Sequence, residues 1–138
     1  MIRRATLDDV PEIVDLGARF LAYSRHRDIP LDRAAFGNFA AGMIDSGVIF
    51  LSDEGMIGAV RCPLYFNPAV IVAAEVFWFA PKEGQALKAA FEQWAVEIGA
   101  YAIQYSAIVD DHAKAVDRIY RRSGCVPIET AYFKRIAS

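Results

Sequence analysis

The spacing of apolar residues changes near Gly47 and divides the chain into a helical first third and a β-rich remainder. Before Gly47, apolar residues recur every three or four positions, which is the spacing of one buried helix face. The pattern predicts a helix that starts near Thr6 or Asp8, either of which can cap it, and continues to about Tyr23. The polar segment "SRHRDIP" then interrupts the pattern. A second helix is predicted to start at about Leu31 and to end before Gly47.

The β-rich part begins with two short runs on either side of a tight turn. The runs are "GVIFLSD" and "MIGAVRCPLYF", and the turn is Asp53-Glu54-Gly55, so we expect an antiparallel hairpin. The next run, "AVIVAAEVFWFA", is apolar except for Glu75. A strand that is apolar on both sides is typically covered on both faces of its sheet. This run therefore predicts a central strand.

Strands and helices alternate in the rest of the chain. The patterns predict a helix after Gly84, a strand in "AYAIQYSAIV", a helix over residues 113–123 and one or two closing strands in "CVPIETAYFKRI". With a short strand in "IRRAT", the predicted fold class is α/β (α+β), with a mixed, mostly antiparallel sheet of about six to seven strands and about four flanking helices. No linker or repeat interrupts the 138 residues, so a single domain over 1–138 is expected.

Composition and charge narrow the classes of function. Hydrophobic residues make up 55% of the chain and charged residues 23%, which is typical of a globular protein. The formal net charge is −2 and no basic block occurs, so nucleic acid is not an expected partner. The longest apolar run is too short to cross a bilayer as a helix, and "MIRRATLDDV" lacks the apolar run of a signal peptide. Because Cys62 and Cys125 are also widely separated, a cytoplasmic protein without a membrane partner is predicted.

Two stretches of the chain resemble the GCN5-related N-acetyltransferases. "IYRRSGCVPIETAYFKRI" is similar to the family's C-terminal pattern, a tyrosine on the last helix, then three residues, then glycine and usually phenylalanine. Tyr120 and Gly124 match this pattern, and Cys125 stands at the phenylalanine position. "EVFWFAPKEGQALKAAFEQWA" is similar to the central strand, pyrophosphate loop and following helix, and resembles small acetyltransferase-like proteins of phages and prophages. Its loop is shorter than the family pattern of Arg or Gln, two residues, Gly, one residue, then Gly or Ala.

The resemblance implies that acetyl-CoA binds between the long apolar strand and the next strand. The end of the long strand would offer backbone groups to the pantetheine arm at Phe77, Trp78, Phe79 and Ala80. The helix start would offer N–H groups to the pyrophosphate at Gly84, Gln85 and Ala86. Lys82 would add a positive charge beside a phosphate. The alternative is that these residues form a solvated turn that joins a strand to a helix.

Two residues are candidates for the chemistry of acetyl transfer to a primary amine. By the resemblance, Tyr120 would donate a proton to the departing CoA thiolate, although a helical tyrosine can also fill a core. Glu75 interrupts the most apolar stretch, where a carboxylate is costly unless it has a partner or faces a cavity. In a cleft its pKa would rise and it could accept the proton of the amine. The alternative is a structural ion pair with Arg61 on the neighbouring strand.

Other chemistries have little support. Asp110-Asp111-His112 has no second cluster of ligands, so no metal is expected, and Asp110 or Asp111 is better suited to cap the last helix. The expected acceptor is an amine on a small molecule or peptide. By family analogy, residues 24–30 and the second helix would line its site. An edge strand near the C-terminus could pair two copies into a homodimer. The alternative to an enzyme is a non-catalytic protein of this fold that serves as a phage-associated binding or assembly module, for which the short loop is the observation.

Overall fold

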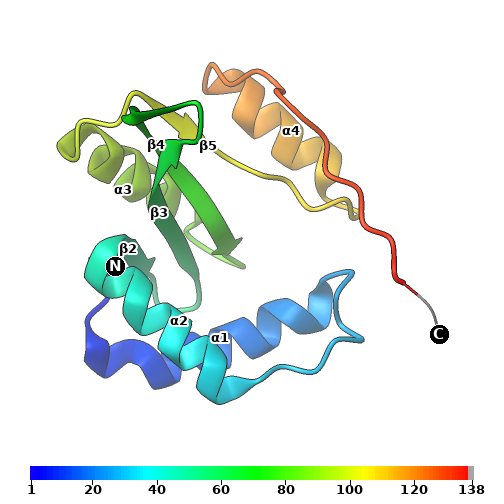
Figure 1. Cartoon of the computed structure of the whole chain (residues 1–138). Coiled ribbons are helices and arrows are strands. Elements are labelled where there is room, and N and C mark those ends of the chain that lie inside the picture. The colour runs from blue at the N-terminus through cyan, green and yellow to red at the C-terminus, as the bar shows by residue number, and fades with distance from the viewer. Residues whose placement is uncertain (137–138) are drawn as a thin grey trace. The chain divides into compact units, whose positions relative to one another are not determined.

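The described part of the chain contains five strands, four α-helices and one short 3-10 helix (Figure 1). The computed structural model describes residues 1–136, and the chain divides into a first unit, Met1–Ser106, and a second unit that begins at Ala107. The elements of the first unit are, in chain order, β1 (Arg3–Arg4), η1 (Leu7–Asp9), α1 (Val10–Tyr23), α2 (Arg33–Ser46), β2 (Val48–Leu51), β3 (Met56–Leu64), β4 (Asn67–Phe79), α3 (Gly84–Glu97) and β5 (Ala102–Gln104). The second unit contains α4 (Ala113–Arg122).

The strands form one sheet in the order β1-β2-β3-β4-β5. All neighbours are antiparallel except β4 and β5, which are parallel, so the sheet is mixed and mostly antiparallel as predicted. The predicted strand number of six to seven is wrong for residues 1–136, because 125–136 form neither helix nor strand. A strand is stabilised when its side chains pack on a half-buried, pleated surface. The side chains of 125–136 are mostly exposed, so this stabilisation is missing. The C-terminal edge strand on which the predicted homodimer depends is therefore absent from the described residues.

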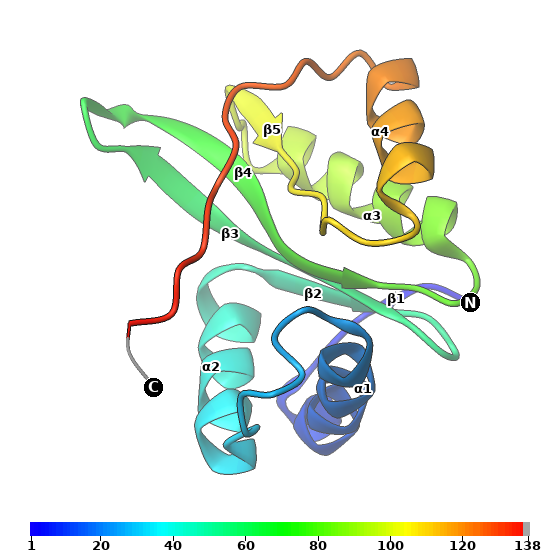
Figure 2. The same cartoon turned by 90° about the vertical axis from the view of Figure 1, so that its right-hand side faces the viewer.

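Helices α1 and α2 cover one face of the sheet (Figure 2). Thr6 caps the short helix η1, and its backbone N–H donates to the Asp9 carboxylate at 2.8 Å. Asp32 caps α2 by accepting a hydrogen bond from the backbone N–H of Ala35. The core on this face is apolar and consists of Ala5, Ile13, Leu16, Ala40, Met43, Ile49, Leu51, Met56 and Phe77.

Helix α3 covers the opposite face (Figure 1). Its buried side chains include Leu87, Phe91 and Trp94, which follow the predicted helical spacing. In the sheet, successive residues of β3 alternate between the two cores: Met56 belongs to the α1/α2 side and Ile57 to the α3 side. The sheet is therefore covered on both faces, as the apolar character of the long central strand predicts.

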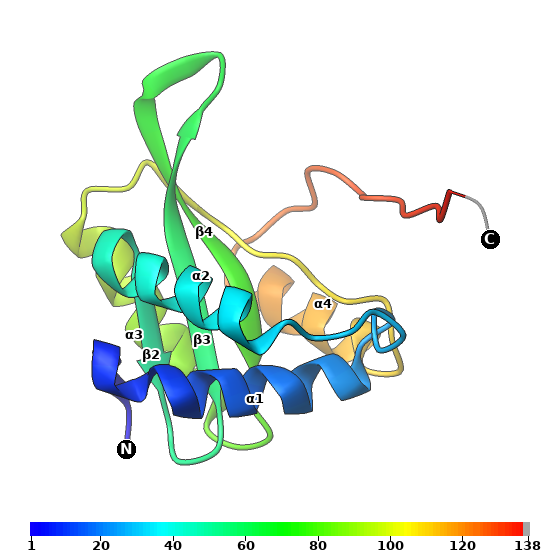
Figure 3. The same ribbon diagram turned by 60° about the horizontal axis from the view of Figure 1, so that its bottom comes forward.

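The antiparallel pair β3 and β4 forms a long hairpin that extends beyond the helices of the first unit (Figure 3). Tyr65 and Phe66 form its tip, where both rings are exposed and meet edge to face with centroids 5.2 Å apart. At the end of the hairpin opposite this tip, β4 leads into the turn before α3. The candidate site lies in this last part of β4.

Helix α4 is preceded by a turn that Asp110 stabilises. The Asp110 carboxylate accepts a hydrogen bond from the backbone N–H of His112 at 2.8 Å, and its carbonyl accepts one from Ala113 at 3.2 Å. His112 is the N-cap residue, and its side chain accepts no capping hydrogen bond among the described contacts. The prediction that Asp110 or Asp111 caps this helix is therefore wrong, because Asp110 stabilises the preceding turn instead.

Candidate functional site

Strand β4 contains an irregularity next to Glu75. The register places Gly58 of β3 opposite Phe77. The next residue of β3, Ala59, lies opposite Glu75, so Val76 has no residue opposite it. Two residues against one is the pattern of a β-bulge, which bends a strand, redirects side chains and is common beside active sites. A Cβ on Gly58 would lie 2.4 Å from the Phe77 ring, so glycine is required for this close approach.

The other edge of β4 loses its strand partner at nearly the same point. β5 pairs with β4 only from Val72 to Ala74, whereas β4 continues to Phe79. Among residues 1–136, no strand pairs with this edge of β4 after Ala74. Backbone N–H and C=O groups on an unpaired strand edge remain able to bond a ligand. The separation of β4 from the chain after β5 is therefore the expected place for the pantetheine arm of a CoA.

Glu75 is half-buried at this separation and bridges the two segments. Its Oε1 accepts a hydrogen bond from the backbone N–H of Ser106 at 3.2 Å and a longer one from the Ser106 hydroxyl at 3.5 Å. A side chain thus makes the link that a continued parallel ladder would make through backbone groups. Burial raises the pKa of Glu75 to about 7, and the hydrogen bonds from Ser106 oppose this only in part. A carboxyl group with this pKa can take up a proton near neutral pH, as a general base must.

The alternative prediction, an ion pair between Glu75 and Arg61, is wrong. Arg61 lies opposite Ala73, and its guanidinium group lies over the Trp94 ring at 6.0 Å from the centroid. Within the described residues, the hydrogen bonds of Glu75 come from Ser106, which is uncharged. Ionised Glu75 is therefore solvated by neutral donors and is not neutralised by a cation.

The turn "PKEG" leads from β4 into α3 and leaves three backbone donors at the helix start. The first bond of the helix runs from the Leu87 N–H to the Glu83 carbonyl at 3.1 Å. The N–H groups of the three preceding residues, Gly84, Gln85 and Ala86, have no acceptor within the helix. Among the described contacts, the N-cap residue Glu83 offers them no side-chain oxygen. The start of α3 thus has the donors that an anion site at a helix N-terminus uses.

The backbone of this turn is strained at Glu83 and not at Gly84. Glu83 has the left-handed conformation, with φ 59° and ψ 24°, which is uncommon for a residue other than glycine. A Cβ on Gly84 would make ordinary contacts, at 3.5 Å from Ala80 and 3.6 Å from the Trp78 ring. Gly84 does not have a positive φ, and an alanine fits at this position.

The charges around the turn are arranged in exposed pairs. The Lys82 ammonium lies 3.3 Å from the Glu54 carboxylate, and the Glu83 carboxylate lies 3.4 Å from the N-terminal amine. Exposed ion pairs contribute little stability and exchange easily. Lys82 can therefore turn to an anion at the start of α3, while the negative charge of Glu83 opposes an anion there.

The spacing of Tyr120 and Gly124 has a structural cause. Gly124 has φ +88°, and its N–H donates to the Arg121 carbonyl at 3.1 Å. The next residue, Cys125, donates to the Tyr120 carbonyl at 3.0 Å, and these two bonds make a Schellman motif that ends α4. Helix capping thus explains the glycine of this pattern, whereas residue 120 contributes only its backbone carbonyl to the motif. Tyr120 is half-buried and belongs to the second unit, and its role as a general acid stays a prediction.

Sequence reasoning missed a polar cluster beside the site. Lys88 is only 6% exposed, and its Nζ donates to Glu92 Oε2 at 2.7 Å. The Tyr105 hydroxyl donates to the same oxygen at 2.5 Å. One signal was available: Lys88 follows Leu87 and precedes Phe91 by three residues, so it lies on the buried side of the helix.

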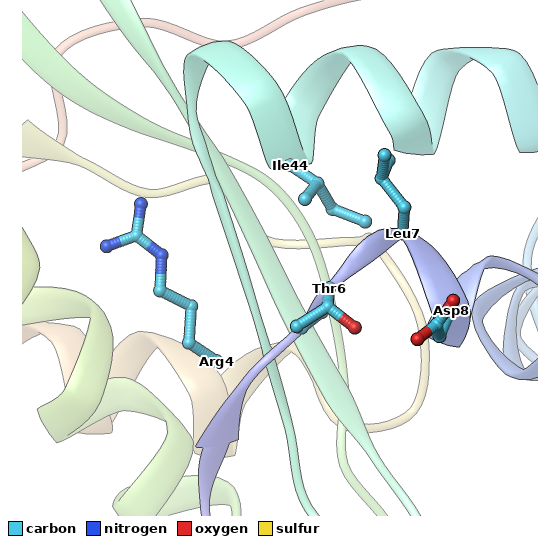
Figure 4. A pocket seen from close by; sticks show the side chains of 6 residues that line it. Arg4, Thr6, Leu7, Asp8 and Ile44 are labelled. Atoms are coloured by element: carbon cyan, nitrogen blue, oxygen red, sulfur yellow. The ribbon is translucent and has the colours of Figure 1, made fainter.

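A shallow, open depression elsewhere in the first unit has different chemistry (Figure 4). It is lined by Arg4, Ala5, Thr6, Leu7, Asp8 and Ile44. The close-up shows Ile44, which projects from α2, next to Leu7 of η1. Its lining includes neither Glu75 nor the start of α3, so the candidate site is placed at the separation of β4 and not here.

Comparison with known proteins identifies the fold. No protein-family model matches the chain, and no curated protein matches it. Among solved structures, a probable acetyltransferase has 17% identity, a TM-score of 0.73 and coverage of 100% of this chain and 99% of its own. A GCN5-related N-acetyltransferase from Ralstonia eutropha JMP134 has 17% identity, a TM-score of 0.70 and coverage of 100% and 99%. AAC(6')-Iy in complex with the bisubstrate analogue CoA-S-monomethyl-acetylneamine has 17% identity, a TM-score of 0.66 and coverage of 100% and 98%.

The chain therefore has the fold of the GCN5-related acetyltransferases, an α+β fold with a mixed sheet, and the predicted fold class is confirmed apart from the strand number. At these identities the likeness establishes the fold and not the reaction. None of the three proteins is described as a phage protein, so the resemblance to phage and prophage proteins has no support. The single domain over 1–138 stays a prediction.

Proposed function

We propose that the protein transfers an acetyl group from acetyl-CoA to a primary amine. The observation that carries the proposal is the separation of β4 from its parallel neighbour at Glu75, a half-buried carboxyl group with a pKa of about 7. In the proposed complex, the pantetheine arm bonds the free edge of β4 from Phe77 to Phe79 and the following residue, Ala80. The pyrophosphate accepts hydrogen bonds from the N–H groups at the start of α3. Lys82 leaves its ion pair with Glu54 and pairs with a phosphate instead.

The proposed reaction needs one base and one acid. Ionised Glu75 accepts a proton from the acceptor ammonium, directly or through water, and the free amine attacks the thioester carbonyl. Backbone N–H groups near Phe79 stabilise the oxyanion that forms. When the carbon–sulfur bond breaks, Tyr120 gives its proton to the CoA thiolate, and the second proton that the amine nitrogen loses as the amide forms passes through solvent to the tyrosinate. The products are the N-acetylated amine and CoA, and the base then releases its proton to solvent. Holding both reactants in one site supplies a further part of the rate enhancement.

The acceptor in this proposal is a primary amine on a small molecule or peptide. AAC(6')-Iy, which has the same fold, is described with a bisubstrate analogue that joins CoA to acetylneamine, and this supports a small-molecule amine. One observation favours a second candidate, a non-catalytic binding module. Glu83 places a carboxylate at the helix start where the pyrophosphate would bind, and this would weaken acetyl-CoA binding.

Release of the CoA thiol in the presence of a panel of primary amines tests the proposal. We expect at least one amine to give turnover that depends on acetyl-CoA, and we expect Glu75→Gln to reduce that turnover about a hundredfold, because general bases contribute roughly that much. Mass spectrometry of the amine should show one added acetyl group. Equal thiol release by the wild type and the Glu75→Gln variant would refute the role of Glu75, and no turnover with any amine, together with no binding of acetyl-CoA, would favour the second candidate.

A further inference from the structure

The chain that follows β5 is held in place by side chains. The β4–β5 ladder ends at Gln104, yet Ser106, two residues later, must be well placed for its backbone N–H to reach Glu75. Tyr105 lies between these two residues. A contact that fixes Tyr105 therefore also restricts the backbone of Ser106.

Tyr105 is fixed by polar contacts to α3 and by ring packing. Its hydroxyl donates to Glu92 at 2.5 Å, and the Lys88 ammonium donates to the same carboxylate oxygen and lies 5.5 Å from the Tyr105 ring centroid. The ring packs edge to face on Phe91, with centroids 5.4 Å apart, and is tilted against Trp78 at 6.3 Å. One tyrosine thus connects α3, β4 and the segment after β5.

The contacts with Glu92 keep its carboxyl group charged. Burial disfavours ionisation, but hydrogen bonds from Lys88 and Tyr105 and the charge of Lys88 together hold the pKa of Glu92 below its ordinary value. Charge-assisted hydrogen bonds are short and stronger than neutral ones. The tyrosine is therefore attached to α3 by a strong and directional contact.

We propose that Lys88, Glu92 and Tyr105 form a clamp that positions Ser106 against Glu75 and so governs when Glu75 can accept a proton. The role in acetyl transfer rests on the proposed function, whereas the coupling between the clamp and Glu75 does not. The residues of the clamp are positioning residues, because they act on Glu75 through Ser106. The Lys88 side chain is buried while that of Glu92 is partly exposed, and burying a lysine is costly unless it has a partner such as Glu92.

The groups around Glu75 leave Ser106 as the contact that the clamp can change. Ala59 on β3 lies opposite Glu75 and is apolar. On the flanking elements, Arg19 lies over the Phe79 ring, Arg61 lies over the Trp94 ring, and Lys88, Glu92 and Tyr105 contact one another. Hydrogen bonds from Ser106 lower the pKa of Glu75 against the effect of burial. Loss of the clamp should therefore move the titration of Glu75 upward.

The test is a carboxyl ¹³C NMR titration of Glu75 in the full-length protein, assigned with Glu75→Gln. The test variant is Tyr105→Phe, which keeps the ring and removes the hydroxyl. The matched control is Tyr101→Phe, which makes the same chemical change on an 80% exposed tyrosine just before β5. We expect Tyr105→Phe to raise the midpoint of Glu75 by about 0.5 unit or more, since a hydrogen bond to a charged group is worth roughly one unit. Tyr101→Phe should leave it unchanged.

A second variant keeps the test decisive if Tyr105→Phe does not fold. Glu92→Leu removes the acceptor of both hydrogen bonds together with a negative charge. Loss of the charge alone would lower the midpoint of Glu75, whereas loss of the clamp would raise it. A rise supports the clamp, and a fall or no change overturns it. An unchanged midpoint in folded Tyr105→Phe would likewise overturn it, since a purely structural tyrosine affects only stability. The titration needs no substrate, so failure to find acetyl transfer would refute the proposed function and leave this result standing.

Discussion

Replacing Glu75 by glutamine should stabilise the protein at alkaline pH. Glutamine has the shape of the protonated carboxyl group and can still accept the hydrogen bond from the Ser106 backbone, but it never ionises. Between about pH 4.5 and 7 the folded protein holds a proton on Glu75 that the unfolded chain has released. The folded state therefore binds more protons in this window, and the free energy of unfolding falls as the pH rises through it.

The size of the effect follows from the pKa difference. The pKa rises from the ordinary value of 4.5 to about 7, a difference of about 2.5 units, and each unit corresponds to about 1.4 kcal/mol. At pH 8.5, where Glu75 is ionised in both states, the wild type should be less stable than Glu75→Gln by about 3 kcal/mol. At pH 5 the difference should be below about 1 kcal/mol. This pH lies near the lower end of the range between the two pKa values, over which the difference accumulates.

Urea denaturation at pH 5 and pH 8.5 measures this difference, with the free energy of unfolding extrapolated to water. The control is Glu129→Gln, which removes an exposed carboxylate and should change the free energy of unfolding little at either pH. If Glu75→Gln and the wild type differ by the same amount at both values of pH, then Glu75 titrates as an ordinary surface carboxyl. The assignment of Glu75 as a base poised near neutral pH would then be refuted.

Three further predictions concern catalysis and the turn before α3. The kcat/KM of acetyl transfer should rise with pH to a plateau above about pH 7, in step with ionisation of Glu75, and a profile that is flat between pH 5.5 and 8 would contradict this. Tyr120→Phe should lower turnover about a hundredfold without loss of stability. The control Tyr132→Phe, at an exposed tyrosine, should leave turnover unchanged. A change below about threefold for Tyr120→Phe, or equal losses in both variants, would count against a general acid at Tyr120. Glu83→Gly should raise the melting temperature, because it relieves backbone strain of roughly 1 kcal/mol. It should also tighten acetyl-CoA binding, because it removes a carboxylate from the helix start. Weaker binding would show that this carboxylate does not oppose the pyrophosphate.

The helices were predictable because burial imposes a period on the sequence. The predicted first helix ends at Tyr23 and the predicted third begins at Gly84, as the structure has them. Strand lengths were less predictable. "AYAIQYSAIV" favours a strand throughout, but only Ala102–Gln104 pair with β4. A strand also needs a partner, and propensity does not tell where the pairing ends.

The candidate site was predictable only where one residue breaks a pattern. Glu75 could be found because it is the single charge in an apolar run. Its partner could not, because the donor is the backbone N–H of Ser106, 31 residues away, and a backbone group leaves no mark in the sequence. Lys88 was missed since a lysine on a helix is usually exposed, and its burial depends on contacts with Glu92 and Tyr105 that only the fold brings together.

The central claim is that an acyl-CoA binds at the end of β4 and the start of α3, and calorimetric titration with acetyl-CoA at low salt tests it most directly. The wild type and Gly84→Ala should both release heat with similar affinity, because an alanine Cβ makes only ordinary contacts in the turn. Gly84→Val should abolish binding, since a branched side chain would occupy the approach of the pyrophosphate to the N–H groups at the helix start. Absence of heat with the wild type at saturating acetyl-CoA, or equal affinity in all three proteins, would contradict the claim.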